Sequence, residues 1–265
     1  MSIEIGFLGA GHMGRAILNG AFASGFLRPD TVLVVERLGP LREAIAELGC
    51  EVAADATALH GVDTLVMCVR PQDFPVAAAA LVSSSPRLVV SVMAGLDSNS
   101  IADACGEATR VVRAMPNAPA SIGRGMTAIA AGRGATAADT DVARGLFAGV
   151  GRVVEVAEAD MFAVTAVSGS GPAWIYLLAE AMREEGIAIG LDDSIIDELI
   201  RGTFEGAAAM LGSSKLHPAE LKQAVTTPGG TTEAGLAAMD QAGLVKAARA
   251  GVHAAYMRGR SIADA

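Results

Sequence analysis

The sequence predicts an α/β fold, a doubly wound parallel sheet over residues 1–157, followed by an all-helical domain over residues 158–265. Strand-like apolar runs alternate with helical patterns through the first half, and a glycine-rich turn directly follows the first strand. After about residue 157 the strand patterns stop and long helical patterns follow. A chain of 265 residues has room for about two domains, since a domain takes roughly 100–200 residues.

Short apolar runs in the first half are typical of buried parallel strands and lie at residues 3–8, 31–35, 64–69, 88–92 and 110–113. Helical patterns fill the gaps at residues 13–23, 40–48, 74–81 and 98–105. A weaker strand, a helix and a last strand are expected at 127–131, 137–148 and 152–156. This alternation predicts a doubly wound sheet, in which ligands bind at the carboxyl ends of the strands.

The second half contains only helical patterns, at residues 158–167, 172–188, 192–212, 217–225, 231–240 and 243–258. Proline near two helix starts (Pro172 and Pro218) and Gly190 after a helix end mark the boundaries. An alanine- and glycine-rich helical domain with this much apolar surface often buries it against a second copy. A homodimer is therefore expected.

Composition narrows the partners and the compartment. The formal net charge is −9 and no basic cluster occurs, which argues against nucleic acid and anionic membranes as partners. No run is expected to reach the roughly 18 uncharged apolar residues of a membrane span. The chain enters a strand at residue 3 without the features of a signal peptide, so we expect a cytoplasmic protein. The cysteines and histidines lack metal-ligand spacing, so no metal site is expected.

The glycine-rich turn reads Gly9-Ala10-Gly11-His12-Met13-Gly14, a G-x-G-x-x-G pattern between the first strand and the first helix. The first glycine permits a tight bend, the second lets a pyrophosphate approach the backbone, and the third allows the helix to pack closely on the strand. We therefore predict that Gly9, Gly11, His12, Met13 and Gly14 bind a dinucleotide. A glycine-rich turn without a ligand is the alternative.

The end of the second strand gives conflicting indications about the cofactor. Glu36 lies 22 residues after Gly14, near the place where an acid binds the adenosine ribose hydroxyls and favours NAD. Arg37 is equally placed to pair with a 2′-phosphate and favours NADP. Solvated side chains at a strand end are a further interpretation of both residues.

Two other strand ends are candidate cofactor contacts. Val69, Arg70 and Pro71 follow the strand at 64–69, and Ala94 and Gly95 follow the strand at 88–92. Small residues and backbone there suit a nicotinamide riboside, and Arg70 could approach the phosphates. Arg70 could instead cap a helix or face solvent.

A hydroxyl- and glycine-rich loop lies between the helical patterns at 217–225 and 231–240. It reads Thr226-Thr227-Pro228-Gly229-Gly230-Thr231-Thr232. Such a loop presents backbone N–H groups and hydroxyls at the N-terminus of the next helix, where a small anion binds well. The alternative is that Thr231 and Thr232 are simply N-cap and first-turn residues.

Five stretches together resemble the Δ1-pyrroline-5-carboxylate reductase family of proline biosynthesis. They are residues 5–14, the central stretch 110–120, the stretch 164–173 that reads Val-Thr-Ala-Val-Ser-Gly-Ser-Gly-Pro-Ala, and the stretches 217–222 and 225–236 around the threonine loop. The resemblance covers nearly the whole chain. It implies an NAD(P)H-dependent reductase with a Rossmann-type cofactor domain and a helical dimerisation domain.

The resemblance also implies roles for individual residues. Thr232 would donate or relay a hydrogen bond at the ring nitrogen of a cyclic imine carboxylate. Backbone N–H groups of Gly229, Gly230 and Thr231 would bind the substrate carboxylate, and Thr226 and Thr227 would line the pocket. NADPH is the expected cofactor, with NADH as the alternative. The resemblance places the active site between the cofactor domain of one subunit and the helices of its partner. Some family members assemble further into decamers, as pentamers of dimers.

This chain departs from the family at three positions. His12 stands where asparagine is usual, Arg70 where lysine is usual, and Trp174 where tyrosine is usual. The competing interpretations are a reductase for a six-membered imine, a β-hydroxyacid dehydrogenase, and a nucleotide-binding module without activity. A β-hydroxyacid dehydrogenase normally carries a lysine on the long inter-domain helix, and residues 172–190 contain none.

Overall fold

The computed structural model describes residues 3–81 and 85–263. The chain divides into two compact units. Unit one comprises Met1–Ser170 together with Ala255–Ala265, and unit two is Gly171–Ala254. The C-terminal helix therefore begins in unit two and ends in unit one. The domain boundary at residues 157 and 158 stays a prediction.

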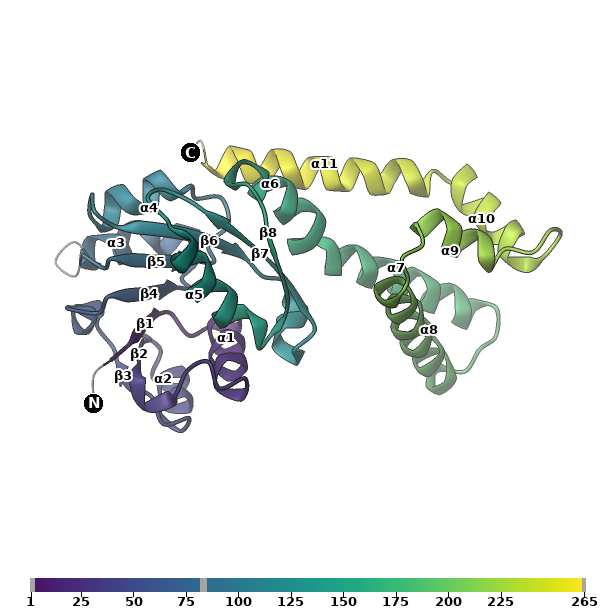
Figure 1. Ribbon diagram of the computed structural model, residues 1–265. Helices are drawn as coiled ribbons and strands as arrows, with labels where there is room; N and C mark the ends of the chain where they lie inside the picture. Colours follow the sequence, from purple (N-terminus) through teal and green to yellow (C-terminus); the bar gives the residue numbers. More distant parts are fainter. Residues whose placement is uncertain (1–2, 82–84, 264–265) are drawn as a thin grey trace. The chain divides into compact units, whose positions relative to one another are not determined.

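Unit one is built on an eight-stranded sheet with the strand order β3-β2-β1-β4-β5-β6-β7-β8 (Figure 1). The strands are β1 Ile5–Leu8, β2 Val32–Val35, β3 Glu51–Ala53, β4 Thr64–Met67, β5 Leu88–Ser91, β6 Arg110–Met115, β7 Gly125–Ala131 and β8 Gly151–Glu155. The chain passes from β1 outward to β2 and β3, then returns to β4 on the other side of β1. The strand order therefore reverses at β1, and ligands bind beside the carboxyl ends of the strands at such a point.

The sheet differs from the prediction at two strands. β7 pairs antiparallel with β6, so the sheet is parallel in all its other pairs but not throughout. Only residues 116–124 connect the two strands, too few for the crossover that a parallel pair requires. β3 was not predicted, because this short strand at the sheet edge is half-exposed and begins with a glutamate.

Helices cover both faces of the sheet, which explains why its strands are continuously apolar. Side chains alternate along β1: Ile5 and Phe7 join the core under α1 (His12–Ala23) and α5 (Ala137–Ala148), while Leu8 joins the core under α3 (Phe74–Leu81) and α4 (Ser98–Cys105). The helices of unit one are α1 His12–Ala23, α2 Gly39–Ala46, α3 Phe74–Leu81, α4 Ser98–Cys105, α5 Ala137–Ala148 and α6 Met161–Val164. Short 3₁₀ helices occur at Pro29–Thr31, Ala56–Leu59, Pro71–Asp73, Ala118–Ile122 and Glu158–Asp160.

A buried arginine ties the sheet to the segment that leads into the helical half. Arg113 on β6 is buried, and its guanidinium lies 3.6 Å from the carboxylate of Glu158. Burial lowers the pKa of Arg113, and the negative charge of Glu158 opposes that shift. Glu158 also accepts hydrogen bonds from the backbone N–H and the hydroxyl of Ser98, at 2.8 and 2.7 Å. These contacts fix the start of the helical segment against β6 and α4.

Unit two is helical, as predicted, and has a small core. Its helices are α7 Gly171–Ala188, α8 Asp193–Ser213, α9 Pro218–Ala224, α10 Thr231–Gln241 and the first part of α11 Leu244–Ala263. Ile196 and Gly186 are buried between α7 and α8, where a Cβ on Gly186 would lie 2.5 Å from the Ile196 side chain. Many large apolar side chains are exposed instead, including Trp174, Ile175, Tyr176, Leu177, Ile189, Ile195, Leu199, Met210, Leu211 and Val245. A surface this apolar is typical of a protein–protein interface.

The expectation that no segment reaches the length of a membrane span was wrong. The continuous helical stretch Glu158–Ala188 is long and apolar enough to cross a membrane by length and composition, and 11% of its most apolar window is buried. No charged side chain occurs between Asp160 and Glu180. Length and composition alone are weak evidence for a membrane, because a helix that packs against another protein has the same properties.

The buried carboxylate of Asp139 provides a test of the fold. It accepts two hydrogen bonds of 2.9 Å from the Arg110 guanidinium and caps the start of α5 together with Thr136. The Arg110 hydrogen bonds lower the pKa of Asp139 to about 2. A carboxylate with a depressed pKa stabilises the fold above its unfolded pKa of about 4, and this stabilisation disappears as the pH falls toward 2.

We therefore expect Asp139→Asn to lower the free energy of unfolding at pH 7 by about 2 kcal/mol. The loss relative to the unchanged chain should shrink between pH 4 and pH 2, as measured by urea denaturation across that range. Asp141→Asn, an exposed position on the same helix, is the matched control. An equal loss of stability at pH 7 and pH 2 would contradict this assignment.

Candidate active site

The glycine-rich turn has the tight geometry that the sequence predicts. Gly9 has φ +91°, a conformation that side-chain-bearing residues rarely adopt. A Cβ on Gly14 would lie 2.7 Å from the carbonyl oxygen of Gly9, so only glycine lets α1 approach β1 this closely. A Cβ on Gly9 would meet the carbonyl of Cys68 at 3.1 Å. The turn that follows β1 therefore packs closely against the residue after β4, Cys68.

Gly11, in contrast to Gly9 and Gly14, is surrounded by open space, because nothing lies within 4 Å of a Cβ built on it. It is the N-cap of α1, and no side chain caps this helix end. The first N–H groups of a helix have no acceptor within it, and the helix dipole makes them attractive to an anion. His12 is exposed beside this end, whereas Met13 is half-buried against the core and offers mainly its backbone. The open space at Gly11 fits a pyrophosphate.

Glu36 and Arg37, which gave conflicting indications about the cofactor, have different surroundings in the structure. Glu36 turns inward: its carboxylate accepts hydrogen bonds from the backbone N–H groups of Ala10, at 2.8 Å, and Leu38, at 2.9 Å. The Arg37 side chain is 72% exposed. Glu36 thus fastens the glycine turn to the end of β2, and Arg37 remains accessible from solvent.

The segment after β4 adds a second cation, Arg70, to Arg37 at the carboxyl ends of the strands. Arg70 pairs with Asp73 at 2.9 Å, and the Arg37 guanidinium lies 4.0 Å from the other oxygen of the same carboxylate. Val69 and Pro71 on either side of Arg70 are half-buried, and Val69 borders Gly9. The predicted residues after β2 and β4 therefore lie together, on both sides of the carboxyl end of β1.

The loop after β5 is covered by the end of the chain. Gly95 is buried with φ +82°, and a Cβ on it would lie 2.5 Å from the Ile262 side chain at the end of α11. Ala94 beside it is half-buried. The sequence could not reveal this contact, because it joins residues 167 positions apart that share no pattern.

Sequence reasoning also missed a contact at the end of β6. The amide nitrogen of Asn117 donates a hydrogen bond to the carbonyl of Ser168, at 3.3 Å, and its oxygen accepts one from the backbone N–H of Met126, at 2.9 Å. Ser168 belongs to a π-helical turn, Thr165–Gly169, which begins inside the helix expected at 158–167 and continues past its expected end. Turns of this kind are frequent at functional sites. The run of glycine and serine from Ser168 to Gly171 was the available signal.

In unit two, the threonine loop ends at a helix start whose N-cap is Gly230, with no side-chain cap. Thr231 and Thr232 are therefore the first two residues of α10, and both are exposed. The interpretation of Thr231 as the N-cap is wrong, because Gly230 holds that position, whereas the first-turn placement of Thr232 is correct.

The loop already satisfies some of its own backbone groups. Gly229 has φ +73°, and its N–H donates to the Glu233 carboxylate at 2.7 Å. The Gly230 N–H donates to the carbonyl of Thr227. The N–H groups of Thr231 and Thr232 lie at the first turn of α10, where no intrahelical acceptor exists. The Thr226 hydroxyl donates to the carbonyl of Lys222 at 2.7 Å.

No metal centre or reactive thiol accompanies these groups in the part of the chain that the structure describes. Within residues 3–81 and 85–263, no group of three or more histidine, cysteine or acidic side chains could hold a metal ion. Burial raises the pKa of the Cys68 thiol beside the glycine turn to about 12, so it stays protonated.

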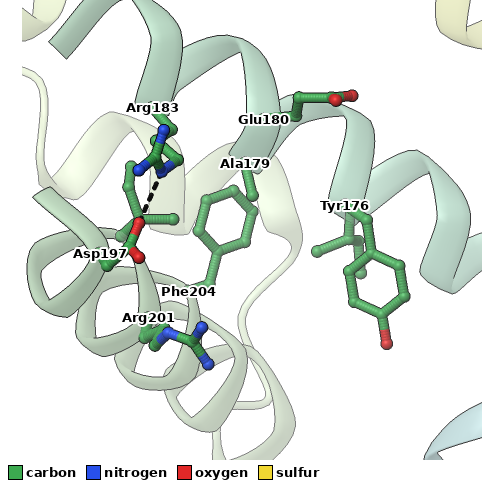
Figure 2. A pocket seen from close by; sticks show the side chains of 9 residues that line it. Tyr176, Ala179, Glu180, Arg183, Asp197, Arg201 and Phe204 are labelled. Carbon is green, nitrogen blue, oxygen red and sulfur yellow. Dashed lines mark hydrogen bonds and ion pairs between the residues drawn. The ribbon is translucent and has the colours of Figure 1, made fainter. Parts of the chain in front are cut away.

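A cavity of about 360 Å³ lies between α7 and α8 in unit two (Figure 2). Arg183 on α7 pairs there with Asp197 on α8, at 2.6 Å, and Figure 2 shows Phe204 between this pair and Tyr176. None of the predicted cofactor or substrate residues lines this cavity. Ile175 and Tyr176 of its lining belong to the exposed apolar surface of unit two, whereas four other lining residues are charged, Glu180, Arg183, Asp197 and Arg201.

The fold and the glycine turn define a dinucleotide-dependent oxidoreductase with a helical second domain. Residues 4–95 match the family described as NADP oxidoreductase, coenzyme F420-dependent, and residues 158–262 match pyrroline-5-carboxylate reductase dimerisation. The chain belongs to the pyrroline-5-carboxylate reductase family.

Its relatives extend over the full length of the chain. It is 38% identical to pyrroline-5-carboxylate reductase of Methanosarcina acetivorans over 91% of both chains, and 37% identical to that of Synechocystis over 99% of both. The solved structure of the Coxiella burnetii enzyme superimposes with a TM-score of 0.87, at 30% identity, over 98% of each chain. The expected family, fold and enzyme class are therefore confirmed, whereas the individual site residues remain predictions.

Two glycines of the turn should respond differently to alanine. Gly14→Ala forces a Cβ against backbone and should lower stability by about 1–3 kcal/mol. Gly11→Ala meets open space and should unfold at the same temperature, yet its methyl group would occupy the place of the pyrophosphate. We expect it to weaken NADPH binding by about tenfold or more, about 1.4 kcal/mol. Thermal unfolding and NADPH titration distinguish the effects; unchanged NADPH affinity in Gly11→Ala would contradict the assignment.

Proposed function

We propose that the chain catalyses the NADPH-dependent reduction of Δ1-pyrroline-5-carboxylate to L-proline, the final step of proline biosynthesis. The observation that carries this proposal is the full-length family match, which includes both the glycine turn and the threonine loop. NADPH supplies a hydride to the imine carbon when it is bound. The chain supplies positions, charges and hydrogen bonds.

The cofactor residues are proposed from the geometry of unit one. The pyrophosphate would lie over Gly11 at the N-terminus of α1, beside Gly9, His12, Met13 and Gly14. Arg37 and Arg70 would hold the 2′-phosphate, because both guanidiniums are exposed at this edge of the sheet. Val69, Pro71, Ala94 and Gly95 would contact the remainder of the dinucleotide.

The inward orientation of Glu36 supports NADPH over NADH. Both oxygens of its carboxylate are occupied by backbone N–H groups, so Glu36 serves the turn rather than a ribose. A guanidinium recognises a phosphate through paired hydrogen bonds, which favours Arg37 as the residue that binds the 2′-phosphate of NADPH. NADH, which lacks that phosphate, would bind more weakly.

The substrate residues are proposed from the threonine loop. The substrate carboxylate would bind at the first turn of α10, at the N–H groups of Thr231 and Thr232, where the helix dipole is positive. Gly229 and Gly230 would shape the turn, and Thr226 and Thr227 would line the pocket. The Thr232 hydroxyl would donate or relay a hydrogen bond at the ring nitrogen, which becomes a secondary amine.

The absence of a strong acid among these residues accords with the chemistry. If the iminium form of the substrate reacts, its nitrogen already carries the proton that the product needs. A hydroxyl that orients the nitrogen is then sufficient. We further propose that the enzyme works in the cytoplasm.

Removal of one hydroxyl tests this mechanism. We expect Thr232→Ala to lower kcat/KM for Δ1-pyrroline-5-carboxylate by about one to two powers of ten, typical of one catalytic hydrogen bond, with unchanged thermal unfolding. Thr232→Ser keeps the hydroxyl and should retain most of the activity. Oxidation of NADPH and NADH at 340 nm measures both variants. Unchanged kinetics in Thr232→Ala would remove this residue from the mechanism.

Self-association follows from the family, and the larger assembly is our proposal. The dimerisation match and the exposed apolar helices support at least a dimer, and the family resemblance supports a decamer built as a pentamer of dimers. We expect light scattering at micromolar concentration to give the mass of a dimer or of a multiple of it. A stable mass of one chain would contradict both.

A further inference from the structure

A single carboxylate lies between the two arginines proposed to read the cofactor. Asp73 accepts a hydrogen bond from Arg70 at 2.9 Å, and its second oxygen lies 4.0 Å from the Arg37 guanidinium. The arginine side chains are 70% and 72% exposed, and that of Asp73 is 29% exposed. The chain therefore places an internal anion where two exposed cations converge.

The position of this cluster in the fold gives it significance. Arg37 follows β2, and Arg70 and Asp73 follow β4, the two strands on either side of β1. The Arg37–Asp73 pair therefore joins the segments that follow the two neighbours of β1. Glu36, the acid beside Arg37 in the sequence, is bonded to backbone N–H groups. Asp73 is thus the carboxylate that both cofactor-facing guanidiniums share.

We propose that Asp73 is a specificity-determining residue, an internal substitute for the 2′-phosphate that limits the preference for NADPH. This inference rests on the proposed NADPH site. In the free chain Asp73 pairs with both arginines; when NADPH binds, its phosphate takes over these guanidiniums. NADH brings no such anion, so the Asp73 pairs persist in its complex.

The energetics favour such an exchange. Exposed ion pairs contribute about 0.2–1 kcal/mol each, so the Asp73 contacts are readily broken. A phosphate carries more charge than a carboxylate and accepts paired hydrogen bonds from guanidinium groups. Once displaced, Asp73 remains a negative charge near the bound phosphate and weakens its binding. The cost applies to NADPH alone, because only NADPH carries the 2′-phosphate.

Asp73→Asn removes the charge with little change in shape. We expect it to tighten NADPH binding about threefold, in the range of one exposed ion pair, and to leave NADH affinity unchanged. Titration of cofactor-free protein by calorimetry measures both affinities without turnover. The gain for NADPH should shrink as salt is raised, because exposed charges are screened. Weaker NADPH binding, an equal change for both cofactors, or no change would overturn the proposal.

Two further variants separate this inference from the proposed NADPH site. Asp30→Asn is the control, because it breaks a comparable exposed ion pair, Arg28–Asp30 at 3.2 Å. This pair precedes β2 and so lies at the amino ends of the strands, away from the proposed site. The control should alter the affinity for neither cofactor. Arg37→Ala should weaken NADPH but not NADH. If Arg37→Ala affects both equally, the 2′-phosphate site itself is misassigned. If Arg37→Ala behaves as expected and Asp73→Asn does not tighten NADPH, only the role of Asp73 fails.

Discussion

The structure of the candidate cofactor site depends on the close approach of Gly14 to the carbonyl of Gly9. A methyl group there would lie 2.7 Å from that oxygen, so this contact fixes how deeply α1 inserts over the end of β1. Gly9 in turn contacts the end of β4 through Cys68. The Glu36 carboxylate holds Ala10 from the side of β2. One helix start is thereby positioned against three strands, and the candidate residues of β2 and β4 border the same turn.

The two proposed anion sites follow one physical rule. Both α1 and α10 begin after a glycine N-cap, Gly11 and Gly230, with no side-chain cap. Four other helices have their first N–H groups capped by side chains, at Asp97, Thr136, Asp192 and His217. A side-chain cap satisfies the N–H groups that a bound anion would use. The starts of α2 and α6 also lack a side-chain cap, but only α1 and α10 among these follow a glycine-rich stretch, one suited to a pyrophosphate and one to a small carboxylate.

Local patterns in the sequence predicted most of the fold, and contacts distant in sequence account for what was missed. Strands covered on both faces are apolar runs, and turn residues such as His217-Pro218 mark helix starts, so both could be located. The direction of β7 depends on the length of its connection, and β3 is too short to form a pattern. The cofactor preference could not be resolved, because Glu36 and Arg37 are neighbours whose side chains point to different partners. The Asn117–Ser168 contact joins positions 51 residues apart.

The helical half indicates why self-association belongs to the fold itself. Within the described part of Gly171–Ala254, buried side chains are few, whereas large apolar residues such as Leu177 and Ile189 are exposed. Apolar burial is the main source of folding free energy, and a unit that buries so little alone is marginal. A partner surface would supply the missing burial. The same reasoning explains why Glu158–Ala188 has the composition of a membrane span: a helix that packs against another subunit needs the apolar surface that a bilayer would otherwise cover.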